Sequence, residues 1–172
     1  MKITKELIIN RTETIKKFAV FSTLLGIAVL LPALIHSQAI TGPIVNATLF
    51  LATFLFSPHI AILIGLLPSL VALATGLLPA PLAPMIPFIM IGNTILILVF
   101  YYLKKKNFWL GVTLASLLKF LFLFSTSSLV IGLLLKKELA KNVALMMNWP
   151  QLITALFGGV IAYFVLKIRG KK

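Results

Sequence analysis

Long apolar runs, separated by short polar or basic segments, make up most of this chain of 172 residues. A helix needs roughly 20 apolar residues to cross a bilayer core about 30 Å thick. Five runs approach that length, namely 18–35, 60–78, 85–103, 108–135 and 149–168. A sixth run, 44–56, reaches only about 20 Å as a helix. The pattern predicts an all-α integral membrane protein, in which residues 1–172 form a single membrane domain with a bundle of six transmembrane helices.

The composition supports this reading and excludes an ordinary soluble domain. Hydrophobic residues make up 60% of the chain, charged residues 11%, and the mean hydropathy is +1.12. A soluble domain has about 25% charged residues. The net charge of +13 is carried in clusters at the ends of apolar runs, whereas nucleic-acid binders spread such charge over one face of a polar domain. The basic residues therefore indicate membrane topology, and no nucleic-acid partner is expected.

The distribution of Lys and Arg predicts that both termini lie in the cytoplasm. With six spans, the inner segments carry twelve basic residues, in the clusters 1–17, 104–106 and 167–172. The outer segments carry only Lys136, Lys137 and Lys141, in keeping with the positive-inside bias. We expect residues 1–17 to form a basic amphipathic helix on the inner leaflet. The run 18–35 exceeds the 7–15 residues usual for a signal peptide, so we expect a retained helix, with cleavage after Ala39 as the alternative.

Lys119 is the basic residue predicted to lie near the middle of the membrane, about 16 Å along the helix that begins at Phe108. A lysine at that depth costs about 2.5–3.5 kcal/mol on insertion scales. The acidic residues of the chain are Glu6, Glu13 and Glu138, and none lies in a span. The missing counter-ion favours an anionic ligand. The alternative is a lysine bonded to helix-end carbonyls in a water-filled crevice.

Other polar residues are predicted at a similar depth, in the outer half of the membrane. Convergence of a few polar groups within apolar surroundings is typical of a small-molecule pocket. With Lys119, the candidate substrate-binding residues are Asn93, Asn148, Trp149, Gln151, His36 and Gln38. Asn46, Ser116 and Thr126 are further polar residues of this region. Singly, each is more simply explained by a bond between helices or a helix cap, and Trp149 equally by an interfacial anchor.

Catalytic and metal chemistry find little support, so we expect no enzyme, no metal site and no cofactor. Cys and Asp are absent, and His36 and His59 are predicted at opposite membrane faces. No two carboxylates can be paired for acid–base work, and there is no glycine-rich phosphate loop. Ion-coupled transporters ordinarily use intramembrane carboxylates or broken-helix ion sites. The absence of such carboxylates disfavours a self-powered transporter.

The order of motifs resembles the substrate-binding S component of energy-coupling factor (ECF) transporters, which import vitamins in prokaryotes. The resemblance covers nearly the whole chain, from a basic N-terminus through six spans. Its motifs are Ser57-Pro58-His59, then Gly65, Pro68-Ser69 and Gly76, a proline-rich loop, and Ile86-Pro87-Phe88-Ile89-Met90-Ile91-Gly92-Asn93.

The resemblance implies a high-affinity substrate-binding subunit in a prokaryotic plasma membrane, without a motor of its own. Such a subunit docks on a membrane T protein served by two cytoplasmic ATPases, and its first outer loop covers the pocket. The family typically carries Ala-x-x-x-Ala in the first span for docking. The corresponding small residues here are Ala19, Ser22, Thr23 and Gly26. The nickel and cobalt members use an N-terminal His, which this chain lacks, so a metal substrate is not expected.

We therefore expect an S component for a vitamin-like organic micronutrient with an anionic group. One rival is a stand-alone permease, which would take up substrate into vesicles without any ATPase. The other is a non-transport membrane enzyme or assembly factor, against which the missing acid–base groups argue. The identity of the vitamin does not follow from the sequence.

Overall fold

The computed structural model describes residues 2–78, 80–134 and 147–170, and no strand occurs among them. The elements are α1 (Lys2–Leu34), α2 (Gln38–Leu55), α3 (Pro58–Ala74), the short 3-10 helix η1 (Ala80–Met85), α4 (Ile86–Leu103), α5 (Phe108–Leu134) and α7 (Trp149–Ile168). The expected all-α class is confirmed. Lys136, Lys137 and Lys141, the expected outer cluster, lie outside the described residues.

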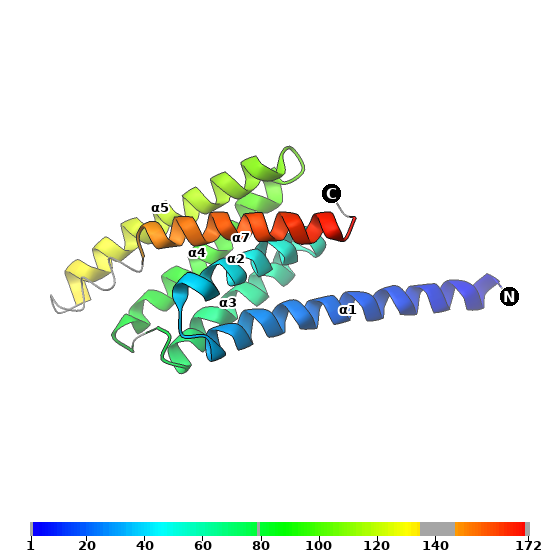
Figure 1. The fold of residues 1–172 in the computed structure, drawn as a ribbon, viewed down its shortest axis with the longest axis horizontal. Helices are drawn as coiled ribbons and strands as arrows, with labels where there is room; N and C mark the ends of the chain where they lie inside the picture. The colour runs from blue at the N-terminus through cyan, green and yellow to red at the C-terminus, as the bar shows by residue number, and fades with distance from the viewer. Residues whose placement is uncertain (1, 79, 135–146, 171–172) are drawn as a thin grey trace.

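The long helices run side by side in alternating directions, so the start of α1 and the end of α7 lie at the same end of the bundle (Figure 1). We call this the basic end, because residues 104–106 and 167–169 also lie there. Five segments are long and apolar enough to cross a membrane, namely Arg11–Leu34, Gln38–Leu55, Leu82–Leu103, Phe108–Val130 and Trp149–Ile168. The helix Pro58–Ala74 is apolar but shorter. This is the architecture of a multi-pass membrane bundle.

The second span is longer than the sequence pattern predicted. The expected span 44–56 is extended at its start, because α2 begins at Gln38 and includes Gly42 and Pro43. In the sequence, Gly and Pro at these two positions indicate a loop. In the structure Gly42 packs directly against α7, and a Cβ added to Gly42 would lie 2.9 Å from Cγ2 of Thr154. Tertiary packing thus overrides the local preference. The first connection, expected to be a loop of residues 36–43, shrinks to residues 35–37.

The third span is shorter than predicted. The expected run 60–78 forms a helix only to Ala74, and Gly76 follows with φ of 77°. This left-handed conformation suits glycine and commonly ends a helix. After Gly76 the chain leaves the helix axis. The backbone N–H of Leu78 then donates to the carbonyl oxygen of Ala72 at 2.8 Å.

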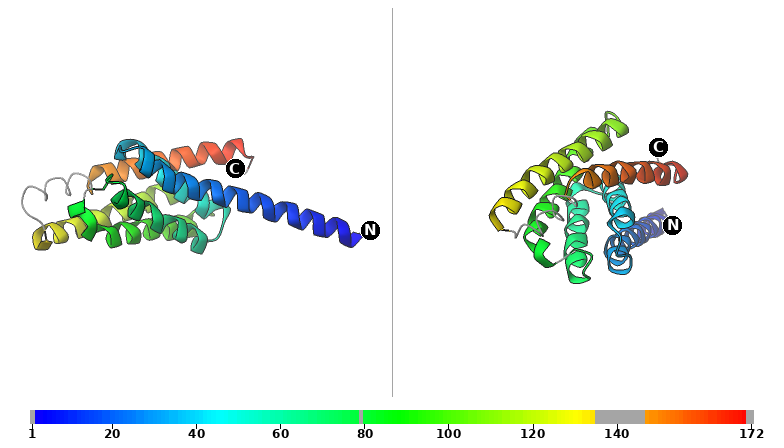
Figure 2. Two further views of the ribbon diagram at one scale, coloured as in Figure 1. Left: turned by 90° about the horizontal axis from the view of Figure 1, so that it is seen from below. Right: turned by 60° about the vertical axis from the view of Figure 1, so that its left-hand side comes forward.

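The basic N-terminal segment is continuous with the first span and does not form a helix of its own. Residues 1–17 were expected to lie on the inner leaflet, but α1 runs without interruption from Lys2 to Leu34. No Gly or Pro occurs between residues 2 and 25, so nothing in the sequence separates the basic from the apolar part. The first turns of α1 project past the rest of the bundle (Figures 1 and 2).

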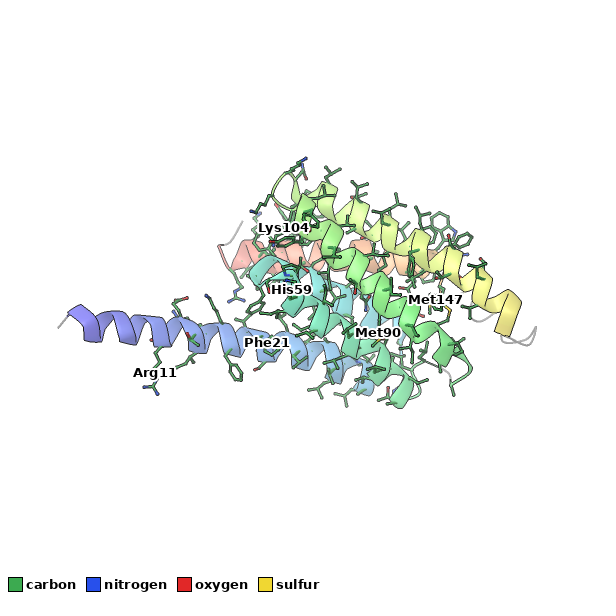
Figure 3. All side chains as sticks on the ribbon, turned by 180° about the vertical axis from the view of Figure 1, so that it is seen from behind. Arg11, Phe21, His59, Met90, Lys104 and Met147 are labelled. Carbon is green, nitrogen blue, oxygen red and sulfur yellow. The ribbon has the colours of Figure 1, made fainter. Side chains whose placement is uncertain are left out.

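Two buried apolar clusters fill the bundle. The larger lies toward the basic end and contains the edge-to-face pair Phe50–Phe100, with ring centroids 4.8 Å apart. The smaller lies toward the opposite end and consists of Leu78, Leu82, Met85, Ile86, Leu123, Val130 and Met147. Figure 3 shows Lys104 and Met147 in these two halves. Along α4 and α5, a polar layer containing Asn93 and Lys119 separates the clusters.

Candidate binding pocket

Lys119 of α5 is buried, with 4% of its surface exposed. Its ammonium group donates to Oδ1 of Asn46 on α2 at 2.7 Å and to Oδ1 of Asn93 on α4 at 2.8 Å. Hydrogen bonds to a charged group contribute about 1.5–3 kcal/mol each, which offsets the insertion cost of about 2.5–3.5 kcal/mol. Neutral amides, rather than helix-end carbonyls, therefore hold the lysine.

The two amides are themselves fixed in orientation. Nδ2 of Asn46 donates to the carbonyl oxygen of Gly42 at 2.9 Å, and Nδ2 of Asn93 donates to that of Gly65 on α3 at 2.8 Å. Because a carbonyl only accepts, each amide nitrogen must face it, and each Oδ1 is left for Lys119. A Cβ at Gly65 would lie 3.1 Å from Cδ1 of Ile97, so the missing side chain lets α4 come close.

The charge of Lys119 has no ionic partner in the part of the chain that the structure describes. An ammonium carries three N–H donors, and no third acceptor for it is found among the described residues. Glu13 is the one carboxylate whose side chain is described; it is exposed on α1 and lies 3.5 Å from Lys16. Since the amides are neutral, the polar layer keeps one buried positive charge.

A pocket opens beside this ammonium, in the half of the bundle away from the basic end. Its volume is about 110 Å³, several times the roughly 10–15 Å³ that one water needs on this measure. The polar lining residues are Gln38, Thr41, Asn46, Ser69, Asn93, Lys119, Gln151 and Thr154. The others are Pro32, Gly42, Val45, Pro68, Ala72, Leu77, Leu78, Ile89 and Met147. Eight of these 17 lining residues are polar, and convergent polar groups beside apolar ones are usual in a ligand site.

The pocket brings together four of the residues singled out from the sequence: Lys119, Asn93, Gln38 and Gln151. They come from α5, α4, α2 and α7, so the first connection contributes through the start of α2 rather than through a loop.

Three other candidates do not line the pocket. His36 is exposed, and its Nε2 donates to the carbonyl oxygen of Thr75 at 3.0 Å, which ties the end of α1 to the end of α3. Trp149 is 62% exposed and stacks on Phe120, with ring centroids 5.4 Å apart. Asn148 is the residue that precedes α7.

A pocket inside a bundle of apolar helices is consistent with the family to which the sequence is matched. The model of the family "ECF transporter, substrate-specific component" matches residues 16–168. The chain belongs to this family. Comparison with curated proteins and with solved structures gives no significant match. The protein is therefore a membrane-embedded, substrate-binding component of a transport system, and the recognition made from the motifs is confirmed.

In this S component, sequence reasoning did not name Thr41, Ser69 or Thr154 as pocket residues, although all three belong to the polar lining. It placed Asn46 in the polar region without naming it as a substrate contact. Thr154 follows Gln151 by three residues, a spacing that places both on one helix face, so it could have been found. Asn46 lies 73 residues from Lys119 in the sequence, and no local pattern reveals that pairing.

The small residues of α1 lie on a face that the described helices leave open. Ala19, Ser22 and Thr23 are exposed, and no heavy atom lies within 4 Å of where a Cβ at Gly26 would be. The hydroxyl of Thr23 donates to the carbonyl oxygen of Ala19 at 2.9 Å, so it turns its proton back to its own helix. The result is an exposed surface of short side chains. We call these four residues the small-residue face.

Proposed function

We propose that this S component captures a small organic anion, a vitamin-like micronutrient, in the pocket around Lys119. The observation that carries the proposal is the ammonium group at the pocket wall, held by two neutral amides and without a carboxylate partner among the described side chains. A buried charge of this kind binds an opposite charge more strongly than a surface charge does, because little water screens it.

The position of the pocket supports capture from outside the cell. Positive residues gather on the cytoplasmic side of membrane proteins, and the basic end carries residues 104–106 and 167–169. The pocket lies in the other half of the bundle. With both termini in the cytoplasm of a prokaryotic cell, its opening faces the medium.

Delivery of the substrate requires partners, since no nucleotide site is expected in this chain. We propose that the small-residue face of α1 docks on a membrane T protein that is served by two cytoplasmic ATPases. Small residues allow helix backbones to approach closely in lipid, and α1 is the least buried of the five spanning segments. Lipid covers this face when the partner is absent.

Mass spectrometry of the small molecules that co-purify with the protein tests the proposed function. The protein purified from its native host should retain an anion, and Lys119→Met purified in parallel should retain little of it. A neutral or cationic compound held equally by both proteins would contradict the proposal. Uptake of the identified compound into vesicles that contain this subunit alone would favour a stand-alone permease instead.

A further inference from the structure

No aromatic side chain lines the pocket. The chain has 13 Phe, 2 Trp and 3 Tyr, and all of them lie among the residues whose side chains the structure describes. The statement therefore holds for every aromatic residue of the protein. Sites for planar heterocycles commonly offer an aromatic face for stacking, and this pocket has none.

The aromatic residue next to Lys119 in the sequence is engaged elsewhere. Phe120 follows Lys119 directly and stacks on Trp149, which is exposed on the outside of the bundle. Phe120 also packs on Phe124, with ring centroids 5.9 Å apart. The wall of the pocket is instead built from aliphatic groups, among them Val45, Leu78 and Met147.

Each of the three hydroxyl groups in the pocket lining donates its hydrogen bond to a backbone carbonyl oxygen of its own helix or of the residue just before it. Thr41 donates to the carbonyl oxygen of Ser37 at 3.0 Å, Ser69 to that of Leu66 at 3.2 Å, and Thr154 to that of Gln151 at 3.2 Å. A hydroxyl has a single proton and two acceptor lone pairs. While that proton is bonded to the backbone, each of these oxygens is left to accept a hydrogen bond from a ligand.

We propose that the pocket selects a non-aromatic, aliphatic acid that carries hydroxyl or amide N–H groups. This inference rests on the proposed function, because its acidic group is the anion that faces Lys119. The free N–H of the ammonium donates to that group, and the back-bonded oxygens of Thr41, Ser69 and Thr154 accept from the ligand's own donors. The aliphatic wall covers the carbon skeleton.

Four ligands of similar size separate these features, each measured by calorimetric titration of the purified protein freed of co-purified ligand. The reference probe is trans-4-hydroxycyclohexanecarboxylate. The aromatic probe, 4-hydroxybenzoate, should bind about threefold to tenfold more weakly, since no stacking partner offsets its lower aliphatic contact. The 4-methoxy analogue, which lacks the donor, should bind about tenfold more weakly. The carboxamide of the reference acid, which lacks the charge, should bind at least about 30-fold more weakly than the acid.

The outcomes separate this inference from the proposed function. If 4-hydroxybenzoate binds as tightly as the reference acid while the carboxamide binds weakly, the anion site stands and the aliphatic inference fails. If the carboxamide binds as tightly as the acid, or if neither acid binds at millimolar concentration, the proposed function itself fails.

A matched pair of threonines on α2 tests the acceptor role. Thr41 and Thr48 are 3% and 2% exposed, and both donate to a carbonyl four residues back. Only Thr41 lines the pocket. Thr41→Val should weaken binding of the hydroxy acid about tenfold and leave the methoxy analogue unaffected, whereas Thr48→Val should change neither. Unchanged affinity of the hydroxy acid for Thr41→Val, Ser69→Ala and Thr154→Val alike would overturn the inference.

Discussion

The ammonium nitrogen of Lys119 lies 2.8 Å from Oδ1 of Asn93, and Nδ2 of the same asparagine lies 2.8 Å from the carbonyl oxygen of Gly65. One side chain on α4 thus links the backbone of α3 to a charge on α5. Asn93 is 3% exposed, so both bonds form away from water, where an unpaired polar group is most costly.

Replacement of Asn93 by Leu should lower the free energy of unfolding by about 1–3 kcal/mol, because it removes one acceptor from a buried ammonium. Chemical unfolding in detergent measures this value. In the background of Lys119→Met, which has no charge to satisfy, the same replacement should cost less than about 1 kcal/mol. An equal cost in both backgrounds would mean that Asn93 stabilises the fold through Gly65 alone.

Replacement of Lys119 by Met should weaken binding of an anionic substrate by about 2–5 kcal/mol, the range for truncation of one member of a buried charge pair. That is a loss of about 30-fold or more. Lys119→Arg should recover only part of it, because a planar guanidinium does not replace a compact ammonium. Lys104→Met is the matched control, since the Lys104 ammonium donates to the carbonyl oxygen of Thr53 and does not line the pocket. Equal affinity of Lys119→Met and the parent would show that the charge does not contact the substrate.

The sequence predicted the helices well where a clear signal marked their ends. The last span was expected at 149–168, the bounds that α7 has, because an unbroken apolar run there ends in a cluster of basic residues. The start of α2 was misplaced because Gly42 and Pro43 usually favour a turn, and the packing of Gly42 on Thr154 is visible only in three dimensions.

The candidate site was predictable only where one segment of the sequence carried the signal. A lysine in an apolar run is conspicuous, so Lys119 could be found from one segment alone. Its partners Asn46 and Asn93 lie 73 and 26 residues away, and hydropathy says nothing about which helices adjoin. For Trp149 the sequence left two readings open, a ligand contact or an interfacial anchor. Its exposed ring stacks on Phe120 and does not line the pocket, which its place at a helix start could not reveal.

Replacement of Gly158 by Ala should destabilise the protein by about 1–3 kcal/mol, as overpacking typically does. A Cβ there would lie 2.8 Å from the backbone nitrogen of Ala47 and 2.9 Å from the carbonyl oxygen of Pro43, so α7 would have to move away from α2. Gly26→Ala is the control. It meets nothing within 4 Å and should be neutral or stabilising by up to about 1 kcal/mol. Thermal unfolding that ranks the two variants in the opposite order would contradict the close packing of α2 on α7.

Replacement of Ser22 by Leu should abolish transport by the reconstituted complex and leave substrate affinity unchanged, because a bulky side chain keeps the backbones of α1 and a partner helix apart. Ser125→Leu makes the same change at another exposed position, on α5, and should transport normally. Pull-down of the T protein, together with uptake by proteoliposomes, provides the two measurements. Normal transport by Ser22→Leu would exclude the small-residue face as the docking surface.

The proposed topology can be tested directly, since the chain contains no Cys. Ala39 and Lys106 are both exposed and lie at opposite ends of the bundle. A membrane-impermeant maleimide added to intact cells should label Ala39→Cys, whereas Lys106→Cys should react only after the cells are opened. The reverse pattern would place the basic end outside and the pocket toward the cytoplasm.

The two amides that hold Lys119 also remove its conformational freedom in advance of binding. A free lysine side chain carries about 2 kcal/mol of rotamer entropy, which a ligand must ordinarily overcome when it orders the chain. Here Asn46 and Asn93 have already fixed the ammonium nitrogen in one place. A small anion is therefore spared that loss, equivalent to a factor of about 30 in affinity, and a molecule with few atoms can bind tightly because the site is preorganised.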